Sequence, residues 1–223
     1  LQDSGEPGLG NVAVSLLDGA GSQLQSTVTT STGNFEFTNL IPGDYQLRFT
    51  APTGYQFTQT AAGDGTLDSD VDPATGTTGM ITFTNGESNS EIDAGLIWKK
   101  STLGDLVWHD VNENGLQDSG EPGLGNVAVS LLDDAGNQLQ STVTTSTGNF
   151  EFTNLIPGDY QLQFIAPTGY QFTVPASGDA ALDSDVDPAT GTTGIITFTN
   201  GETNTTIDAG FFKEKATLGV QAR

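Results

Sequence analysis

The sequence predicts an all-β protein built from two-sheet sandwich units, and three observations support this prediction. Short segments rich in Val, Thr, Phe and Tyr alternate with turn signals such as Asp-Ala-Gly, Thr-Gly-Asn and Ile-Pro-Gly-Asp. No window keeps a period near 3.6 residues, and the 29 glycines and 9 prolines would interrupt helices throughout the chain. The chain also repeats itself, because residues 1–58 return as residues 116–173 with four differences. A period this long indicates one whole domain per copy, each with its own core.

The expected strands of the second copy follow one another at short intervals. An opening segment around Leu103, Leu106 and Trp108 is rich in strand formers, and the period-two alternation of a half-buried strand resumes at 126–131. Further strands are expected at 138–145, 149–153, 159–164 and 195–198. The core of this copy is expected to draw on Phe150, Phe152, Leu155, Tyr160, Leu162, Phe164 and Tyr170.

A run of twelve residues, 110–121, has the spacing of a calcium-binding loop. Oxygen-bearing side chains stand at positions one, three, five, nine and twelve, and Gly115 at position six permits a sharp turn. Calcium takes about six to eight oxygen ligands, and position seven of such a loop supplies only its carbonyl oxygen. The alternative is an acidic surface turn that binds nothing. The predicted ligands are the side chains of Asp110, Asn112, Asn114, Asp118 and Glu121 and the carbonyl of Leu116.

The residues around this loop predict that it joins two strands. Strand formers precede it, and after Pro122 and Gly123 the alternation of a strand resumes. An EF-hand sensor would need a pair of helices that open when calcium binds. The flanks therefore argue against a sensor and favour a structural calcium loop.

A second acidic pattern recurs in both copies, with carboxylates at alternate positions. In an extended segment such side chains point the same way, and the cluster repels itself unless a cation lies between the charges. We therefore expect a second metal site in each copy, against the alternative of a flexible acidic loop that ends at Pro73 or Pro188. The pattern comprises Asp68, Asp70 and Asp72 in the first copy and Asp183, Asp185 and Asp187 in the second. Asp93 and Asp208 are weaker candidates, because a carboxylate at a strand end that accepts backbone N–H bonds explains them equally well.

The repeat predicts three parts in this chain: a first repeat at 1–98, a complete second repeat at 101–213, and the start of a third repeat or a tail at 214–223. In the first repeat Asp3 and Glu6 match loop positions nine and twelve, whereas the preceding strand and the first three side-chain ligands have no counterpart. The favoured interpretation is that the sequence is a fragment of a longer array. If it is instead the natural chain, a strand and loop from another chain are expected to complete this repeat by head-to-tail strand addition.

The composition limits the partners of the chain. With 28 acidic and 6 basic residues, the formal charge of −22 calls for cations from solution and makes nucleic acid or an anionic membrane surface an unfavourable partner. A solvated acidic surface is the other interpretation of the acids outside the motifs. There is no cysteine and no long apolar span in this window, so neither disulfides nor membrane insertion is expected.

An enzymatic function is not expected. His109 is the only histidine, and it has no duplicate in the other copy. A lone histidine beside a calcium loop is more often a surface or strand residue than a catalytic base. Serines and aspartates are present without a nucleophile elbow or any other catalytic spacing.

The motifs also carry a family resemblance. The run from Leu103 to Asp118, followed by Glu-Pro-Gly at 121–123, resembles the opening of the serine-aspartate repeat protein B domain, the calcium-binding branch of the Cna B-type family. Later landmarks are similar, at 148–152, 155–160, 167–170, 183–187 and 208–210. The resemblance implies an immunoglobulin-like β-sandwich, found in tandem on bacterial surface proteins, that takes Ca2+ for rigidity. The internal Lys–Asn bond of many Cna B-type domains is not expected, because the lysines lie only at the unit junctions.

Two functions of different class follow from these observations. The first is a stiff extracellular spacer or filament subunit on a bacterial surface, or secreted, whose partners are neighbouring repeats of the same protein. The second is an adhesin module that binds a host or neighbouring-cell ligand. Near-identity of the copies favours the spacer, because each copy adds length whereas one good copy is enough for a ligand site.

Overall fold

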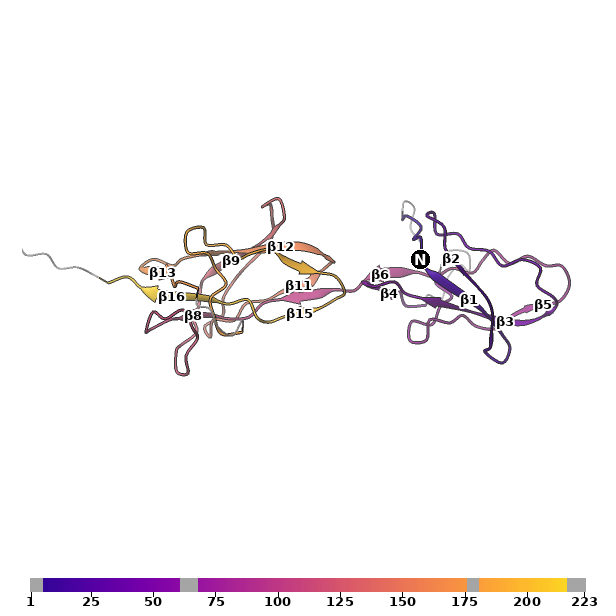
Figure 1. Ribbon diagram of the computed structural model, residues 1–223, viewed down its shortest axis with the longest axis horizontal. Helices are drawn as coiled ribbons and strands as arrows, with labels where there is room; N and C mark the ends of the chain where they lie inside the picture. The colour runs from indigo at the N-terminus through magenta and orange to yellow at the C-terminus, as the bar shows by residue number, and fades with distance from the viewer. Residues whose placement is uncertain (1–5, 61–67, 176–180, 216–223) are drawn as a thin grey trace, which may run out of the picture. The chain divides into compact units, whose positions relative to one another are not determined.

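The computed structural model describes residues 6–60, 68–175 and 181–215, which fall into two compact units. Unit 1 comprises residues 1–99 and unit 2 comprises residues 100–223. The described residues form sixteen strands and no helix (Figure 1), so the all-β class predicted from the sequence is confirmed. None of them belongs to a helix long and apolar enough to cross a bilayer.

Unit 2 consists of a four-stranded sheet and two three-stranded sheets. The four-stranded sheet has the order β10-β9-β12-β14, and the smaller sheets have the orders β11-β7-β15 and β13-β16-β8. All pairings are antiparallel except β15 with β7 and β16 with β8. The strands are β7 (Ser101–Leu103), β8 (Val107–His109), β9 (Ala128–Asp133), β10 (Gln138–Val143), β11 (Phe152–Leu155), β12 (Gly158–Ile165), β13 (Tyr170–Phe172), β14 (Ile196–Phe198), β15 (Thr203–Asn204) and β16 (Ala209–Lys213).

The core of unit 2 lies between these sheets. Alternate residues of β12 (Tyr160, Leu162 and Phe164) are buried, and they join one apolar cluster with Leu103 of β7 and Phe211 of β16. The period-two alternation thus places one face of each strand inside, where a fully buried Leu or Phe contributes about 1.5–3 kcal/mol. Six of the seven expected core residues are buried, and the seventh, Tyr170, is half-buried and packs against the cluster.

A close backbone approach fixes the segment that follows residues 110–121. A Cβ at Gly123 would lie 1.9 Å from the carbonyl oxygen of Thr147, so no larger residue fits there. Gly148 on the opposing segment has φ of +87°, a conformation that glycine adopts at little cost. The end of the twelve-residue segment is therefore held against residues 145–149 by two glycines.

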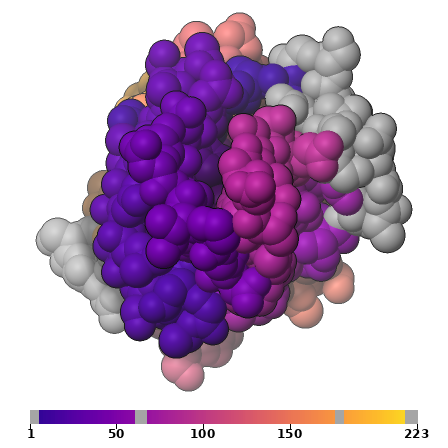
Figure 2. All heavy atoms as spheres, turned by 90° about the vertical axis from the view of Figure 1, so that its right-hand side faces the viewer, coloured from indigo at the N-terminus to yellow at the C-terminus, as the bar shows by residue number. Residues whose placement is uncertain are grey.

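Unit 1 has a four-stranded sheet of order β2-β1-β3-β5 and a pair β4-β6. Its core cluster includes Val14, Leu16, Tyr45, Leu47 and Phe49, from β1 and β3. Figure 2 shows a face of this unit, with the segment after β5 in magenta at the surface. The strands are β1 (Ala13–Asp18), β2 (Gln23–Val28), β3 (Gly43–Thr50), β4 (Tyr55–Phe57), β5 (Ile81–Phe83) and β6 (Leu96–Trp98).

Candidate metal centre

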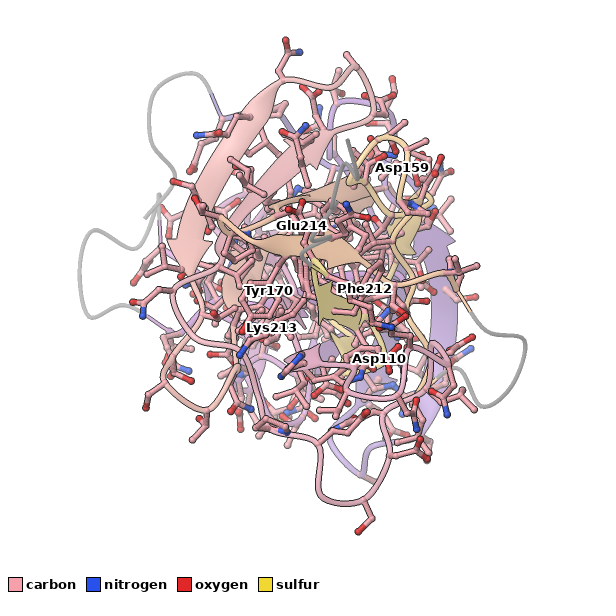
Figure 3. The ribbon with its side chains drawn as sticks, turned by 90° about the vertical axis from the view of Figure 1, so that its left-hand side faces the viewer. Asp110, Asp159, Tyr170, Phe212, Lys213 and Glu214 are labelled. Atoms are coloured by element: carbon pink, nitrogen blue, oxygen red, sulfur yellow. The ribbon has the colours of Figure 1, made fainter. Side chains whose placement is uncertain are left out.

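The twelve-residue loop 110–121 starts directly after β8 and leads towards β9, so the prediction that it joins two strands is confirmed. β8 pairs in parallel with β16, and the N–H of Asp110 continues this pairing by donating to the carbonyl of Phe211 at 2.8 Å. The first ligand position of the loop is therefore fixed to the last strand of the unit. Figure 3 views unit 2 with Asp110 and the neighbouring residues Phe212 and Lys213 labelled.

Asp110 is fully buried, and its carboxylate is saturated with donors. Its Oδ2 accepts the N–H of Gly115 at 2.8 Å and the hydroxyl of Thr173, and its Oδ1 accepts the N–H of Asn114 at 3.2 Å. A buried carboxylate is stable only with such partners. Gly115, with φ of +81°, provides the turn that brings its N–H to this carboxylate, as the sequence predicted.

The remaining predicted ligands of the loop are brought together in one hydrogen-bond network. Asp118 Oδ2 accepts the side-chain amides of Asn112 and Asn114, at 2.7 and 2.8 Å. Glu121 accepts the N–H of Val111 at 2.7 Å and that of Asp118 at 3.1 Å, closing position twelve onto the start of the loop. The side chains of Asn112, Asn114, Asp118 and Glu121 are thus held together within one loop by hydrogen bonds.

The loop is also joined to the second acidic segment, a link that sequence reasoning missed. Leu116 forms an isolated antiparallel bridge with Asp183. On either side of it, Gln117 N–H donates to the carbonyl of Leu182 at 2.7 Å, and Ser184 N–H donates to that of Gly115 at 3.3 Å. The two acidic motifs, far apart in sequence, therefore belong to one region of unit 2. No local pattern in the sequence signals this pairing.

Asp208 is the residue around which the second acidic group is organised. It is only 1% exposed; its N–H donates to Asp185 Oδ2 at 2.8 Å, and its Oδ1 accepts the N–H of Leu106 at 3.2 Å. Asp208 Oδ2 and Asp183 Oδ1 are buried and have no hydrogen-bond partner in the described part of the chain. Orphaned buried carboxylate oxygens are costly, and a cation would satisfy them.

The electrostatics of this group agree with its geometry. Burial raises the pKa of Asp208 to about 8, and the nearby negative charges of Asp105, Asp185 and Asp183 add to the shift. Burial likewise raises the pKa of Asp185 to about 6, with repulsion from Asp183 as a smaller cause, and it raises the pKa of Asp105. The raised pKa values of Asp105, Asp185 and Asp208 mean that these three carboxyl groups resist ionisation unless positive charge is added.

Asp187 differs from Asp183 and Asp185 in being exposed and engaged in a local turn. Its Oδ1 accepts the N–H of Ala189 at 2.9 Å, so the exposed carboxylate closes the turn that follows. The strict alternation expected from the sequence therefore continues for two carboxylates, and the third caps a turn. Asp208, the weaker candidate in the sequence, is bonded directly to Asp185: the N–H of Asp185 donates to its carbonyl, and its own N–H donates to the carboxylate of Asp185.

Unit 1 repeats this arrangement in its own acidic group. Asp93 N–H donates to Asp70 Oδ2 at 2.8 Å, and Asp68 Oδ1 is buried without a hydrogen-bond partner among the described residues. Burial raises the pKa of Asp93, with repulsion from Asp70 and Asp68 as further causes. Asp72 caps a turn through Ala74 N–H at 2.8 Å, as Asp187 does in unit 2. Glu6 is exposed, and Asp3 lies outside the described residues.

The chemical type of the candidate ligand atoms suits a hard cation. Carboxylate, amide and carbonyl oxygens are the ligands that calcium prefers, and neither sulfur nor imidazole stands among them. His109 instead packs its ring edge-on against Tyr170, with centroids 5.5 Å apart. In the described ranges, no three His, Asp or Glu side chains are already arranged as a metal shell. Occupation of either site therefore requires side chains to turn from their present hydrogen bonds towards the ion.

Comparisons with known proteins place this chain in a family. The sequence model of the SdrD B-like domain matches residues 1–96 and 101–211. Serine-aspartate repeat-containing protein D of Staphylococcus aureus (strain Newman) is 39% identical over 221 residues, which are 98% of this chain and 16% of that protein. Serine-aspartate repeat-containing protein F of Staphylococcus epidermidis (strain ATCC 12228) is 40% identical over 215 residues, or 96% of this chain and 12% of that protein. The chain thus spans less than a fifth of the length of these relatives.

A solved structure supports the fold. The Bacillus anthracis TIE protein superposes with a TM-score of 0.55 at 18% identity, over 92% of this chain and 31% of that one. The sequence relatives are surface proteins of Gram-positive bacteria, so the chain is an extracellular or cell-surface module and not an enzyme, as expected. The family model matches two stretches that together cover most of this sequence, so the chain belongs to the SdrD B-like domain family.

Proposed function

We propose that this structural surface module is a spacer or filament subunit whose stiffness depends on Ca2+. The observation that supports the proposal is the preformed loop 110–121, whose first predicted ligand, Asp110, is bonded through its backbone N–H to the last strand of unit 2. The loop would hold calcium through Asp110, Asn112, Asn114, Asp118, Glu121 and the carbonyl of Leu116. The bound ion supplies positive charge among carboxylates that otherwise repel one another.

The buried acidic group would form a second site in the same unit. Asp183 and Asp208 each offer a buried oxygen without a partner, and Asp105 and Asp185 add two further carboxylates. Because loop and acidic group share the bridge between Leu116 and Asp183, order in one supports order in the other. In unit 1, Asp68, Asp70 and Asp93 would form the corresponding site.

Contacts at the exit of β16 explain how the loop would stiffen the molecule. Asp110 holds the carbonyl of Phe211, and Glu113 of the loop pairs with Lys215 at 2.8 Å. Glu214 N–H donates to the carbonyl of Gly169 at 2.9 Å. Residues 211–215 are thus held on one side by the loop and on the other by Gly169, the residue before β13. A closed loop would therefore restrain the end of β16 and the two residues after it.

A calcium titration followed by thermal unfolding tests this function. Calcium should raise the melting temperature of unit 2, and Glu121→Ala should abolish most of this gain while leaving the chelated protein almost unchanged. Asp134→Ala is a matched control, because this acid lies in an exposed turn outside both acidic groups. An identical melting temperature with calcium and with chelator would refute the proposal.

Strand pairing also favours self-association, with a second copy of this chain as the partner. In unit 2, β16 pairs with β13 on one side and β8 on the other, whereas among the described residues of unit 1, β6 pairs only with β4. A strand equivalent to β8 from a second copy could add to β6, giving head-to-tail assembly. Light scattering over a range of concentrations tests it, and a strictly monomeric chain would exclude it.

An adhesive function is the second candidate, and a shallow groove on unit 2 favours it. The groove has a volume of about 530 Å³ and is lined by Thr142, Val143, Phe150 and Glu151, together with Asp105. Saturable binding of a glycan or peptide that is weakened by Val143→Asp would support adhesion. Binding that this substitution leaves unchanged would place the ligand elsewhere.

A further inference from the structure

The dipeptide Asn-Gly occurs three times in this chain, at 85–86, 114–115 and 200–201. Asparagine before glycine is the pair most open to spontaneous deamidation, because no side chain hinders the glycine nitrogen. That nitrogen loses its proton and bonds to Cγ of the asparagine, the Cγ–Nδ2 bond breaks, and ammonia leaves. Water then opens the resulting imide at either carbonyl, giving aspartate or isoaspartate. The reaction needs a free glycine N–H and a side chain that can turn towards it.

The copy at Asn85 is open to this reaction. Asn85 and Gly86 are both exposed, and among the described residues nothing lies within 4 Å of the position that a Cβ on Gly86 would take. Figure 2 shows the segment after β5, which contains this pair, at the surface of unit 1. Both residues of this pair are therefore accessible, and no described neighbour crowds Gly86 where a Cβ would lie.

The copy at Asn114 is closed by the loop. Gly115 is buried, and its N–H is bound at 2.8 Å to the buried carboxylate of Asp110. The side chain of Asn114 is fixed at both ends, since its Oδ1 accepts the N–H of Leu116 at 2.8 Å and its Nδ2 donates to Asp118 at 2.8 Å. The attacking nitrogen of Gly115 and the side-chain amide that contains the target carbon are therefore both held by hydrogen bonds.

We propose that Asn114 is a latent deamidation site that is released only when the loop opens. The same dipeptide that reacts freely at Asn85 is then protected at Asn114, and its conversion records how often the loop has been open. Conversion to aspartate adds a third carboxylate beside Asp110 and Asp118, and conversion to isoaspartate lengthens the backbone within the turn. The modification therefore changes the loop itself. Protection by the fold stands without a metal; only its dependence on calcium rests on the proposed function.

The test is a time course of the whole chain at neutral pH, followed by peptide mapping that resolves asparagine, aspartate and isoaspartate. In the folded chain Asn114 should convert at least about tenfold more slowly than Asn85, the ratio for an opening free energy of about 1.4 kcal/mol. In denaturant the two rates should become similar. Equal rates at both positions in the folded chain would overturn the proposal.

Two variants assign the protection to named bonds. Asp110→Asn weakens the acceptor of the Gly115 N–H and should speed conversion of Asn114 while leaving Asn85 unchanged; Asp134→Asn, in an exposed turn, is the matched control. If Asp110→Asn leaves the rate at Asn114 as slow as before, the hydrogen bond from Gly115 to Asp110 is not what protects Asn114, and the proposal fails. Added calcium should slow Asn114 further. If calcium does not alter this protection, the proposed calcium function fails, whereas the protection of Asn114 by the folded loop still stands.

Discussion

Unit 1 and unit 2 have nearly the same sequence over 58 residues, yet their cores are closed to different degrees. In unit 2, Phe150 and Phe152 are 6% and 3% exposed, whereas the equivalent Phe35 and Phe37 of unit 1 are only half-buried. The tetrapeptide Phe-Thr-Asn-Leu forms β11 in unit 2, and in unit 1 the same four residues, 37–40, form no strand. Strand formation here is decided by the partner and not by the local sequence.

The partner that makes the difference is the segment before the loop. β11 pairs with β7, and Val107 at the start of β8 donates its N–H to the carbonyl of Gly148 at 2.9 Å. β8 then pairs with β16 and covers Phe211, which is fully buried, whereas Leu96 at the same place in unit 1 is half-buried. Residues 101–109 therefore cover the core of unit 2, and they also place the start of the loop beside β16.

Removing Trp108 should be the most damaging way to make unit 2 resemble unit 1. This side chain is fully buried on β8 and lies against Gly210, where a Cβ would come within 2.7 Å of the ring. Trp108→Ala should lower the unfolding free energy of unit 2 by about 3–5 kcal/mol through the cavity it leaves. Urea unfolding followed by circular dichroism measures it. Trp98→Ala, at a residue 38% exposed in unit 1, is the control and should cost far less.

Asp208 should make the stability of metal-free unit 2 depend on pH. Its pKa is about 8 in the folded state against 3.8 as the ordinary value, so the folded state holds more protons between these values. Stability is therefore greatest below about pH 4 with respect to this group and falls by a few kcal/mol as pH rises towards 8. Thermal unfolding in chelator measures the slope. Asp208→Asn should flatten it, and an unchanged slope would assign it to other groups.

Calcium should change the protease resistance of the two units to different extents, and it should change their secondary structure little. The strands carry their own apolar pattern, so chelation should leave circular dichroism almost unchanged while the loop 110–121 becomes easier to cleave. A calcium concentration about 100 times Kd would stabilise the bound form by about 2.7 kcal/mol. Cleavage in unit 1 should respond less, because its described residues offer the acidic group around Asp93 and, of the predicted loop ligands, Glu6 alone. Loss of the β signal on chelation would show instead that folding and binding are one event.

Much of the fold was predictable from the sequence because its signals are local. Turn dipeptides and period-two alternation located β9, β10 and β12, and the loop spacing identified residues that the structure brings into one network. The bridge between Leu116 and Asp183 was not predictable, since it joins segments 67 residues apart through backbone groups alone. The burial of Asp208 was not predictable for a similar reason, because its contacts come from Leu106 before β8 and from Asp185, both distant in the sequence.

The ion pair between Lys215 and Glu113 should have the smallest effect on stability, and it tests the difference between holding the exit and stabilising the fold. The nitrogen and oxygen are 2.8 Å apart, but the lysine side chain is 79% exposed, so water and salt screen the attraction. Lys215→Ala should change the unfolding free energy by no more than about 0.5 kcal/mol. Lys99→Ala in unit 1 provides a comparison at another junction lysine. If the loop restrains the exit of β16, Lys215→Ala should nonetheless speed proteolysis after Lys213 at low salt, and the difference from the parent chain should vanish at high salt. Equal cleavage rates at every salt concentration would show that the ion pair does not restrain this segment, and that the backbone bonds from Asp110 to Phe211 and from Glu214 to Gly169 hold it.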